Sequence, residues 1–387
     1  MGWERQKPFT TEQPSPPSSG GWLISGVLAV IAGVLLFVLH ASGSLTVLKL
    51  LNIWLFALIP VVLWILTFST RGYLYGRELE RFQFFQSEAE HAQQQWTAWA
   101  ERYIAVSANC VMLPDSVSAA LLKQSLRGLP QQQGLVRRID YLKGNKAVMN
   151  ALLGGIESSL QNLPGEAALQ VTVLTDEPES GRQKLYTLFD ECWLAHAPVQ
   201  LRPSSLNITD QLSLQYLDER LGQPESTIQL ILVMQMHGDA RYSDGLAALL
   251  FTSDDVAQKY TLPHAVRVLR PMLFDVSHLS EELSLLLTTQ TQACQTLSVL
   301  ADHQKWTQSS AALITIGNAL GTRWEAENIL TIETYCGIQG PFSPWLTLAL
   351  GADFVHIGQQ SWLALSTTGA ENFVYTIASG SGDERFK

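Results

Sequence analysis

The chain has 387 residues, 47% of them hydrophobic, and a formal net charge of -10 at pH 7. This length and apolar content are enough for one large domain or two, each with its own core. The acidic balance, without a basic run that includes aromatic residues, argues against a nucleic-acid partner. The four cysteines are far apart and form no CxxC pair, so we expect buried thiols rather than a disulfide framework or a metal site. They are Cys110, Cys192, Cys294 and Cys336.

Two long apolar runs follow a proline- and serine-rich tail, residues 1–21, which we expect to be disordered. The run from Trp22 to His40 has no formally charged side chain, and the run from Val47 to Phe68 has only Lys49. Each run is long enough to cross about 30 Å of hydrocarbon. We therefore assign residues 22–70 to two transmembrane helices, with residues 22–68 in contact with the lipid bilayer. A cleaved signal peptide explains the pattern less well, because a second long run follows the first at once.

Basic residues predict the orientation of these helices. Arg5 and Lys7 precede the first run, and three arginines follow the second, whereas the connection between the runs offers only Lys49. The three are Arg71, Arg77 and Arg81. Because positive charge is enriched on the cytoplasmic side, both ends of the chain are expected in the cytoplasm.

Residues 71–103 mix charged and aromatic side chains at helical spacing, which predicts a stalk that continues the second span. Trp96, Trp99 and Tyr103 share one face of this helix. We expect that face to pack on the body of the protein rather than on a partner. The body itself is predicted to be a cytoplasmic domain of residues 104–387.

The body alternates helix and strand patterns. Buried apolar strands alternating with helices indicate a layered α/β domain with a mixed sheet. Helices are expected at 111–126 (beginning at Asp115 or Ser116), 146–160, 180–197, 211–222, 280–303 and 344–355. Strands are expected at 168–176, 227–238, 245–254, 265–273, 311–317, 328–336, 361–368 and 372–379.

This order resembles a thiolase-like domain of the β-ketoacyl-synthase type over about residues 167–378. The first half closes on "GLAALLFTSDD", and the second half has a strand, the glycine turn "YCGIQGPF", an apolar helix and a final hairpin. The resemblance implies a cysteine at the start of a buried helix and a histidine in the glycine turn. At the first place this chain reads "VLTDEPESGRQKL", with Cys192 only late in the helix, and the turn has no histidine before His356. The resemblance therefore implies a site that lacks its catalytic pair.

Membrane-tethered, catalytically degenerate proteins of this shape resemble accessory proteins of bacterial type VI secretion, in particular the adaptor family that helps load lipase effectors. This resemblance implies a non-catalytic role at the bacterial inner membrane, no cofactor, and a protein partner such as a secreted effector or a secretion component. Aromatic side chains would then be partner anchors. The candidates are Trp306, Trp324, Trp345 and Trp362.

An enzyme is the main alternative: a membrane-tethered acyltransferase or hydrolase with Cys336 as its nucleophile. A helix N-terminus beside Cys336 would lower the pKa of its thiol. However, Pro341 and Pro344 predict that the helix begins about seven residues later. Glu333, within the strand expected at 328–336, is a second candidate if it is buried.

Two further interpretations stay open at this stage. "MHGDARYSD" holds His237, Asp239 and Asp244, which could bind a metal or exchange protons, although a solvated hairpin connection would collect the same residues. The small residues of the first span could instead pair it with other membrane helices, as in an envelope assembly component. They are Gly26, Ala29 and Gly33.

Overall fold

The computed structural model describes residues 2–3, 11–42, 52–124, 129–198, 200–223 and 226–380. It divides into two compact units. One unit is Arg5–Gln95, and the other is the body, which combines Met1–Glu4 with Trp96–Lys387. The N-terminal part of the tail, where disorder is expected, lies largely outside the described residues.

The first unit holds two helices, α1 (Ser19–Ala41) and most of α2 (Ile53–Ala100). Both are long and apolar enough to cross a membrane, judged by length and composition. Their large apolar side chains are exposed, such as Leu23 at 70% and Leu55 at 69%, which distinguishes them from the core helices of a soluble protein. α2 continues without a break past Pro60 and has 48 residues, or about 72 Å at 1.5 Å per residue.

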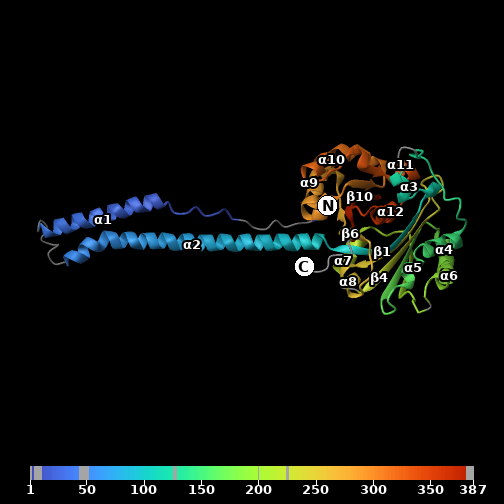
Figure 1. Ribbon diagram of the computed structural model, residues 1–387, viewed down its shortest axis with the longest axis horizontal. Coiled ribbons are helices and arrows are strands. Elements are labelled where there is room, and N and C mark those ends of the chain that lie inside the picture. The colour runs from blue at the N-terminus through green and yellow to red at the C-terminus, as the bar shows by residue number, and fades with distance from the viewer. Residues whose placement is uncertain are drawn as a thin grey trace. The chain divides into compact units, whose positions relative to one another are not determined.

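The two apolar helices lie side by side (Figure 1). The indole N–H of Trp64 donates to the Ser25 hydroxyl at 2.9 Å. A Cβ on Gly33 would lie 2.6 Å from the carbonyl oxygen of Ala57, so only glycine permits this approach. Gly26 and Gly33 therefore face α2 of the same chain.

The body is built on a single mixed sheet of 11 strands within the described residues. Five strands form its first half: β1 (Tyr103–Met112), β2 (Ala168–Thr175), β3 (Ser205–Thr209), β4 (Thr227–Gln235) and β5 (Gly245–Ser253). Six form its second half: β6 (Val266–Leu269), β7 (Met272–Leu273), β8 (Ser298–Ala301), β9 (Ile329–Thr331), β10 (Trp362–Thr368) and β11 (Glu371–Ser379). The short β7 pairs only with β11 and lies outside the main order.

The two halves repeat one topology. The strand order is β3-β2-β4-β5-β1 in the first half and, read from the other edge, β9-β8-β10-β11-β6 in the second. In each half the first three strands are parallel and the last two continue antiparallel. The antiparallel pair β1–β6 joins the halves, with Ile104 opposite Val268. The two halves of the sheet thus share one strand order, although the amino-acid sequence of the first half is not repeated in the second.

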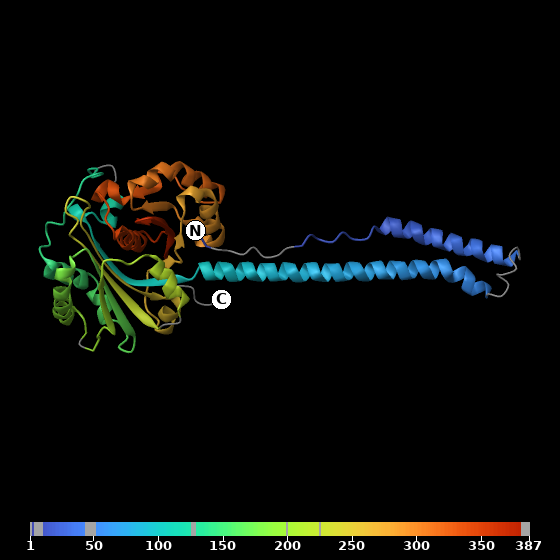
Figure 2. The same cartoon turned by 180° about the vertical axis from the view of Figure 1, so that it is seen from behind.

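Helices cover the sheet in three layers, as Figures 1 and 2 show. α4 (Asn145–Gly155) and α6 (Glu179–His196) pack on the outer side of the first half. α9 (Leu279–Thr289) and α10 (Ser310–Ala319) pack on the outer side of the second half. Between the halves lie α7 (Gln215–Gly222) and α12 (Ser343–Gly358). The shorter helices are α3 (Ala119–Gln124), α5 (Glu157–Gln161), α8 (Asp254–Lys259) and α11 (Ile332–Cys336).

This arrangement explains why the middle of the sequence is so apolar. Every residue of β5 is buried, as is all of β4 except Thr227, because both faces of these strands are covered. α12 is buried on almost every side, since it lies between the two halves. The layered α/β architecture with a mixed sheet is confirmed.

Several element assignments made from the sequence were wrong. Residues 311–317 form helix α10 rather than a strand, because this apolar segment packs on α9 as one face of a helix. The helix expected at 280–303 ends at Thr289, and Ser298–Ala301 is instead β8, the middle one of the three parallel strands of the second half. The strand expected at 328–336 stops at Thr331 and continues as α11. β1 and β3 were not foreseen.

Helix starts also moved. The helix expected to begin at Asp115 or Ser116 begins as α3 at Ala119, and the Ser118 hydroxyl accepts the N–H of Leu121 at 3.3 Å. Asp115 and Ser116 have positive φ angles of 55° and 56°, which no helix adopts. α8 was not foreseen either, and the strand expected at 265–273 is divided into β6 and β7. The other elements lie close to their expected positions, including the antiparallel hairpins β4–β5 and β10–β11.

Candidate functional site

The glycine turn between α11 and α12 is the part of the body where the sequence resemblance implied a catalytic histidine. Gly337 has φ 78°, which favours glycine, and its N–H donates to Glu333 O at 3.1 Å. Ser243 N donates to Ile338 O at 2.8 Å, and Phe342 N donates to Gln235 Oε1 at 3.1 Å. The turn is therefore held against the ends of β4 and β5.

Cys336 is the last residue of α11, and so lies at the wrong end of a helix for dipole activation. Its side chain is 2% exposed and packs among Leu113, Leu350 and Phe354. Burial, and then the nearby Asp115 carboxylate, raise the pKa of its thiol to about 12. Among the described residues no histidine is hydrogen-bonded to Cys336. α12 begins at Ser343, seven residues on, as Pro341 and Pro344 predict.

An extended segment, residues 129–139, covers this turn; we call it the cover segment. Gln132 N donates to Thr334 O at 2.7 Å, and Ile338 N donates to Leu135 O at 2.9 Å. A Cβ on Gly337 would lie 2.2 Å from Leu135 O, and one on Gly340 would lie 2.4 Å from the Gln235 side chain. The space beside Gly337 and Gly340 is therefore filled by protein.

Two arginines fix the cover segment. Arg137 makes a bidentate contact with Asp115, with nitrogen–oxygen distances of 2.7 to 3.0 Å. Arg138 pairs with Asp244, whose side chain is 4% exposed and which also accepts the N–H of Ile139 at 3.0 Å. The expectation that Asp244 belongs to a solvated turn was therefore wrong, because this carboxylate is buried under the cover segment.

A buried carboxylate closes the second half of the sheet. Asp302 follows β8 and is 0% exposed. It accepts four hydrogen bonds, from His303 N, Trp306 Nε1, Ser343 Oγ and Thr367 N. Serine, aspartate and histidine do meet here, but the Ser343 hydroxyl donates to the carboxylate directly, with no imidazole between them. This group ties α12 to the strands and has the geometry of a structural network.

The first half has an equivalent carboxylate, Asp176, directly after β2. It accepts Met236 N at 3.0 Å, His237 N at 2.8 Å and the Tyr242 hydroxyl at 3.2 Å. His237 lies between two carboxylates, 3.3 Å from Asp176 and 3.1 Å from Glu177, and its side chain is 40% exposed. Burial raises the pKa of the Tyr242 hydroxyl to about 12.

His237 is thus separated from Asp244, with which the sequence grouped it, and its partners are residues that the sequence did not single out. Asp239 lies in the connection between β4 and β5 with φ 47°. No group of three or more metal-ligating side chains occurs in the described parts of the chain. The cluster around His237 holds the β4–β5 connection.

The resemblance implied a cysteine at the start of a buried helix, and the sequence comparison placed that helix at α6. α6, the helix compared from the sequence, lies in an outer layer. α7 lies in the central layer with α12, and the residues before it read "TDQLSL", which include no cysteine. Ser213 there donates to Glu371 Oε2 at 2.9 Å rather than to an imidazole. Neither central helix therefore begins with an activated nucleophile.

Three of the four tryptophans predicted as partner anchors are core residues. Trp306, Trp324 and Trp345 are each 1% exposed, and their indole N–H groups donate to Asp302, Thr296 and Leu212. Such side chains are out of a partner's reach. Trp362 is half-buried, with its ring stacked 4.4 Å from that of Phe354. Glu333 lies in α11, where its carboxylate accepts the N–H of Gln304 at 2.7 Å.

The end of α2 is anchored on the body by its backbone. Arg270 Nε donates to Trp99 O at 3.0 Å, and Gln290 Nε2 donates to Ala100 O at 2.9 Å. These side chains cap carbonyls that have no partner within the helix. The chain then enters β1 at Tyr103, so the long apolar helix continues directly into the strand that joins the two halves.

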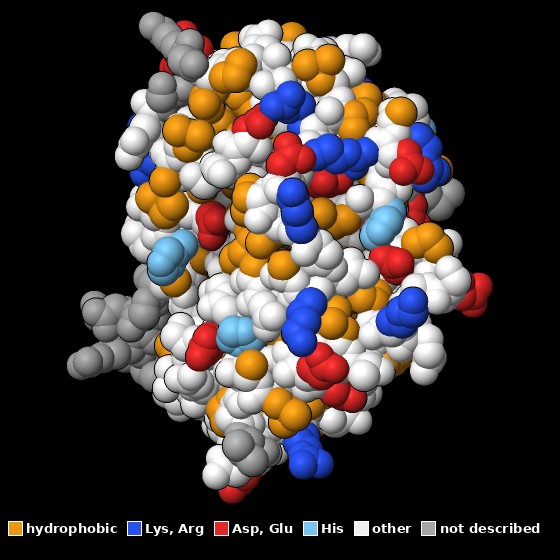
Figure 3. All heavy atoms as spheres, turned by 90° about the vertical axis from the view of Figure 1, so that its right-hand side faces the viewer, with side chains coloured by type: hydrophobic (Ala, Val, Ile, Leu, Met, Phe, Trp, Pro, Cys, Tyr) orange, Lys and Arg blue, Asp and Glu red, His pale blue; other side chains and the backbone are white. Residues whose placement is uncertain are grey.

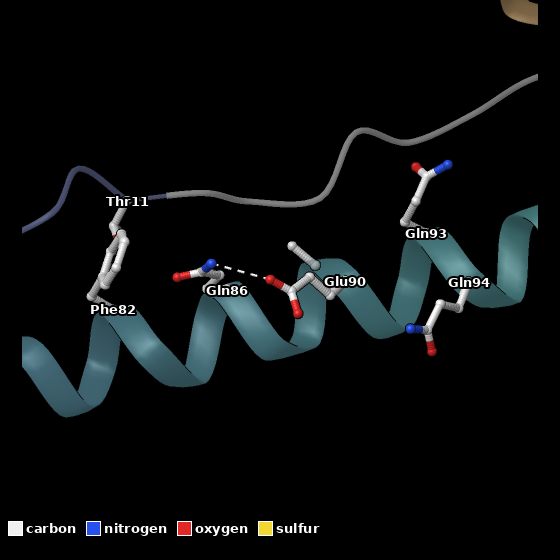
Figure 4. A pocket seen from close by; sticks show the side chains of 7 residues that line it. Thr11, Phe82, Gln86, Glu90, Gln93 and Gln94 are labelled. Atoms are coloured by element: carbon white, nitrogen blue, oxygen red, sulfur yellow. Dashed lines mark hydrogen bonds between the residues drawn. The ribbon is translucent and has the colours of Figure 1, made fainter. Parts of the chain in front are cut away.

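The surface of the body offers no single strongly charged face in the view of Figure 3, where acidic and basic side chains are interspersed. A shallow hollow lies along α2 (Figure 4). It is lined by Thr11, which precedes α1, and by α2 side chains that include Phe82, Gln86, Glu90, Gln93 and Gln94. Gln86 donates to Glu90 at 3.1 Å within it. This hollow is open to solvent and holds no arrangement of catalytic groups.

No protein-family model and no curated protein sequence matches the chain. Solved structures with a similar arrangement are ketosynthases and related enzymes. AntDE:AntF, a ketosynthase with its type II PKS acyl-carrier protein, has a TM-score of 0.47 at 8% identity, over 72% of this chain and 99% of that one. Synthase III for 3-oxoacyl-[acyl-carrier-protein] from Aquifex aeolicus VF5 has a TM-score of 0.41 at 12% identity, over 71% and 99%.

A third structure is ketosynthase twelve of the bacillaene polyketide synthase in Bacillus amyloliquefaciens. Its TM-score is 0.46 at 10% identity, over 72% of this chain and 73% of that one. These scores are all below 0.5, and the fold of the chain is defined by its own layers and strand order.

Proposed function

We propose that this protein is a membrane-anchored, non-catalytic adaptor or scaffold. The observation that carries the proposal is the filled glycine turn: Cys336 is 2% exposed, its thiol pKa is about 12, and the cover segment occupies the space beside it. A cysteine nucleophile must be a thiolate in contact with its substrate. Cys336 meets neither requirement.

The anchoring is supported by α1 and α2, whose exposed apolar side chains need an apolar environment. The distribution of Arg5, Lys7 and the three arginines after Phe68 favours cytoplasmic ends, and hence a body in the cytoplasm at the bacterial inner membrane. The capped end of α2 belongs to the body, and the helix connects the body covalently to the apolar segments, as a tethered scaffold requires.

For the partner we propose a lipase effector of type VI secretion or a component of that apparatus, as the sequence resemblance implies. Of the four tryptophans first considered, Trp362 alone keeps part of its surface accessible, and we propose it as an anchor for that partner. Because the face shown in Figure 3 mixes charges of both signs, recognition would depend on local contacts rather than on a large field.

The full chain, purified in detergent with each lipase effector of a type VI system from the same host, tests this proposal. An adaptor gives a stoichiometric complex on gel filtration, which Cys336→Ala leaves intact and Trp362→Ala weakens about tenfold or more. Leu194→Ala is the matched control, since Leu194 is 73% exposed on α6 and is not part of the proposed surface. Labelling of wild-type protein at Cys336 by a thiol-directed acyl probe, with loss of function in Cys336→Ala, would establish the enzyme instead.

A further inference from the structure

Two residues that precede the first apolar helix are bound to the body. Trp3 lies against Trp99 and Trp96, with ring centroids 5.4 Å and 6.2 Å apart and the rings nearly perpendicular. Its indole N–H donates to Pro271 O at 3.3 Å. Gly2 N donates to Glu282 Oε1 at 2.9 Å. A backbone amide, an aromatic ring and an indole N–H are thus each matched by a group of the body.

The body residues that make these contacts are themselves held in place. Trp96 and Trp99 stack on each other at 4.7 Å, and the guanidinium carbon of Arg270 lies 4.1 Å from the centre of the Trp99 ring. Trp96 Nε1 donates to Thr289 Oγ1 at 3.3 Å. Glu282 accepts the N–H of Asp275 with its second oxygen, so its first oxygen is oriented toward Gly2. The contact surface is therefore preorganised.

Edge-on aromatic pairs at these distances are favourable beyond the apolar area that they bury. Trp3 also packs against the outer core of the second half, beside α9. A tryptophan that merely touched the surface would have neither the N–H acceptor nor the two perpendicular ring partners. The contacts together have the composition of a recognition site for a Gly-Trp pair.

We propose that Trp96, Trp99, Pro271 and Glu282 form a docking site for Gly2 and Trp3 of the same chain. This latch closes a loop of chain from Trp3 to Trp96 that contains both apolar helices. Residues before the first span and after the second are then held on one surface, which a two-span hairpin allows and a single span forbids. The inference holds whether or not the protein is an adaptor.

A disulfide trap in the full chain, reconstituted in phospholipid vesicles, tests the latch. In Gly2→Cys/Glu282→Cys, mild oxidation is expected to join the two introduced cysteines, because a Cβ on Gly2 lies 3.3 Å from the Glu282 carboxyl carbon. Gly20→Cys/Glu282→Cys is the control and is expected to remain reduced, because Gly20 has no neighbour within 4 Å. Peptide mapping separates this disulfide from any made by the native cysteines.

Mixing isotopically heavy and light chains before oxidation decides the occupant. Heavy–heavy and light–light products alone support docking within one chain, whereas heavy–light products, or no product, overturn it. Adding Trp3→Ala to the trap is expected to slow disulfide formation about tenfold. Trp3→Phe keeps an aromatic ring but lacks the indole N–H, and is expected to slow it by less. Equal rates in all three would show that Trp3 contributes nothing to docking and would also overturn the proposal.

Discussion

Asp176 and Asp302 occupy equivalent places in the two halves of the sheet. Each is the first residue after the central parallel strand of its half, β2 or β8, and each accepts a backbone N–H from the end of the neighbouring strand, β4 or β10. The duplication therefore extends from strand order to individual hydrogen bonds. The surroundings differ, since Asp302 is fully buried and Asp176 lies beside the partly exposed His237.

This difference predicts unequal effects of removing the carboxylates. Asp302→Ala removes the acceptor of four hydrogen bonds, three of them buried, and is expected to cost about 3–5 kcal/mol of unfolding free energy. Asp176→Ala is expected to cost less, about 1–3 kcal/mol, because water can reach its neighbours. Denaturant unfolding of the full chain in detergent, with the exposed Asp190→Ala as control, measures both. Equal costs would contradict the structural role assigned to Asp302.

Gly337 and Gly369 form a matched pair for testing the cover segment. Both have positive φ, 78° and 58°, so alanine at either is strained by about 1–2 kcal/mol. Only at Gly337 does an added Cβ also meet a neighbour, Leu135 O at 2.2 Å. Gly337→Ala is therefore expected to cost about 1–3 kcal/mol more than Gly369→Ala and to displace the cover segment. Protease sensitivity of residues 129–139, unchanged in Gly369→Ala, reports that displacement.

The thiol of Cys336 is expected to be inert in the folded protein. With a pKa raised from 9.0 to about 12, its thiolate fraction at pH 8 is about a thousandfold below that of an ordinary cysteine. Labelling with a maleimide and mapping by mass spectrometry should modify half-buried Cys294 first and Cys336 only after unfolding. Modification of Cys336 at the rate of Cys294 would contradict the sealed turn.

The two arginines of the cover segment are expected to contribute unequally to the unfolding free energy. Arg138→Ala leaves the buried Asp244 without its cation and should cost about 3 kcal/mol. Arg137→Ala removes a partner of Asp115, whose side chain is 41% exposed, and should cost about 1 kcal/mol or less. Thermal unfolding at low and high salt separates them, since salt weakens only the exposed pair appreciably. A larger loss for Arg137→Ala would reverse the assignment.

Asp353 on α12 gives the body a pH dependence. Burial raises the pKa of this carboxyl from 3.8 to about 6, although Asn109 donates a hydrogen bond to it. The folded state binds this proton more tightly than the unfolded state, so the contribution of Asp353 to the unfolding free energy is highest below about pH 4 and is lost as pH rises through 6. Asp353→Asn should remove this fall and be more stable than wild type at pH 8 by up to about 3 kcal/mol. Parallel unfolding curves at every pH would refute the burial of Asp353.

The layered α/β class was readable from the sequence because β4, β5 and α12 are largely apolar on all sides. A strand buried on both faces, or a helix buried on all sides, is rich in apolar residues, and this composition can be recognised in the sequence without knowing which elements pack on it. The two long apolar helices were readable for the same reason. Cys336 was also correctly expected to be remote from the start of α12, because prolines at 341 and 344 restrict the backbone locally.

The errors fall where packing overrides local preference. Residues 311–317 contain β-branched residues at strand-like spacing. They nevertheless form α10, because as a helix this segment packs its apolar face against α9. β8 was hidden at the end of a helical pattern, and its identity depends on pairing with β9 and β10, which come later in the chain. Trp306, Trp324 and Trp345 were predicted from the sequence as surface anchors, and the fold buries all three in the core.

The sequence by itself determined what depends on composition and neighbouring residues: two apolar helices, the class of the body and the lack of a histidine in the glycine turn. Only the tertiary structure decided that the turn is covered, that Asp176 and Asp302 are equivalent, and that Trp3 meets Trp99. Each of these joins residues far apart in the chain, such as Leu135 and Gly337. Such contacts depend on the complete arrangement of the layers, which no local pattern contains.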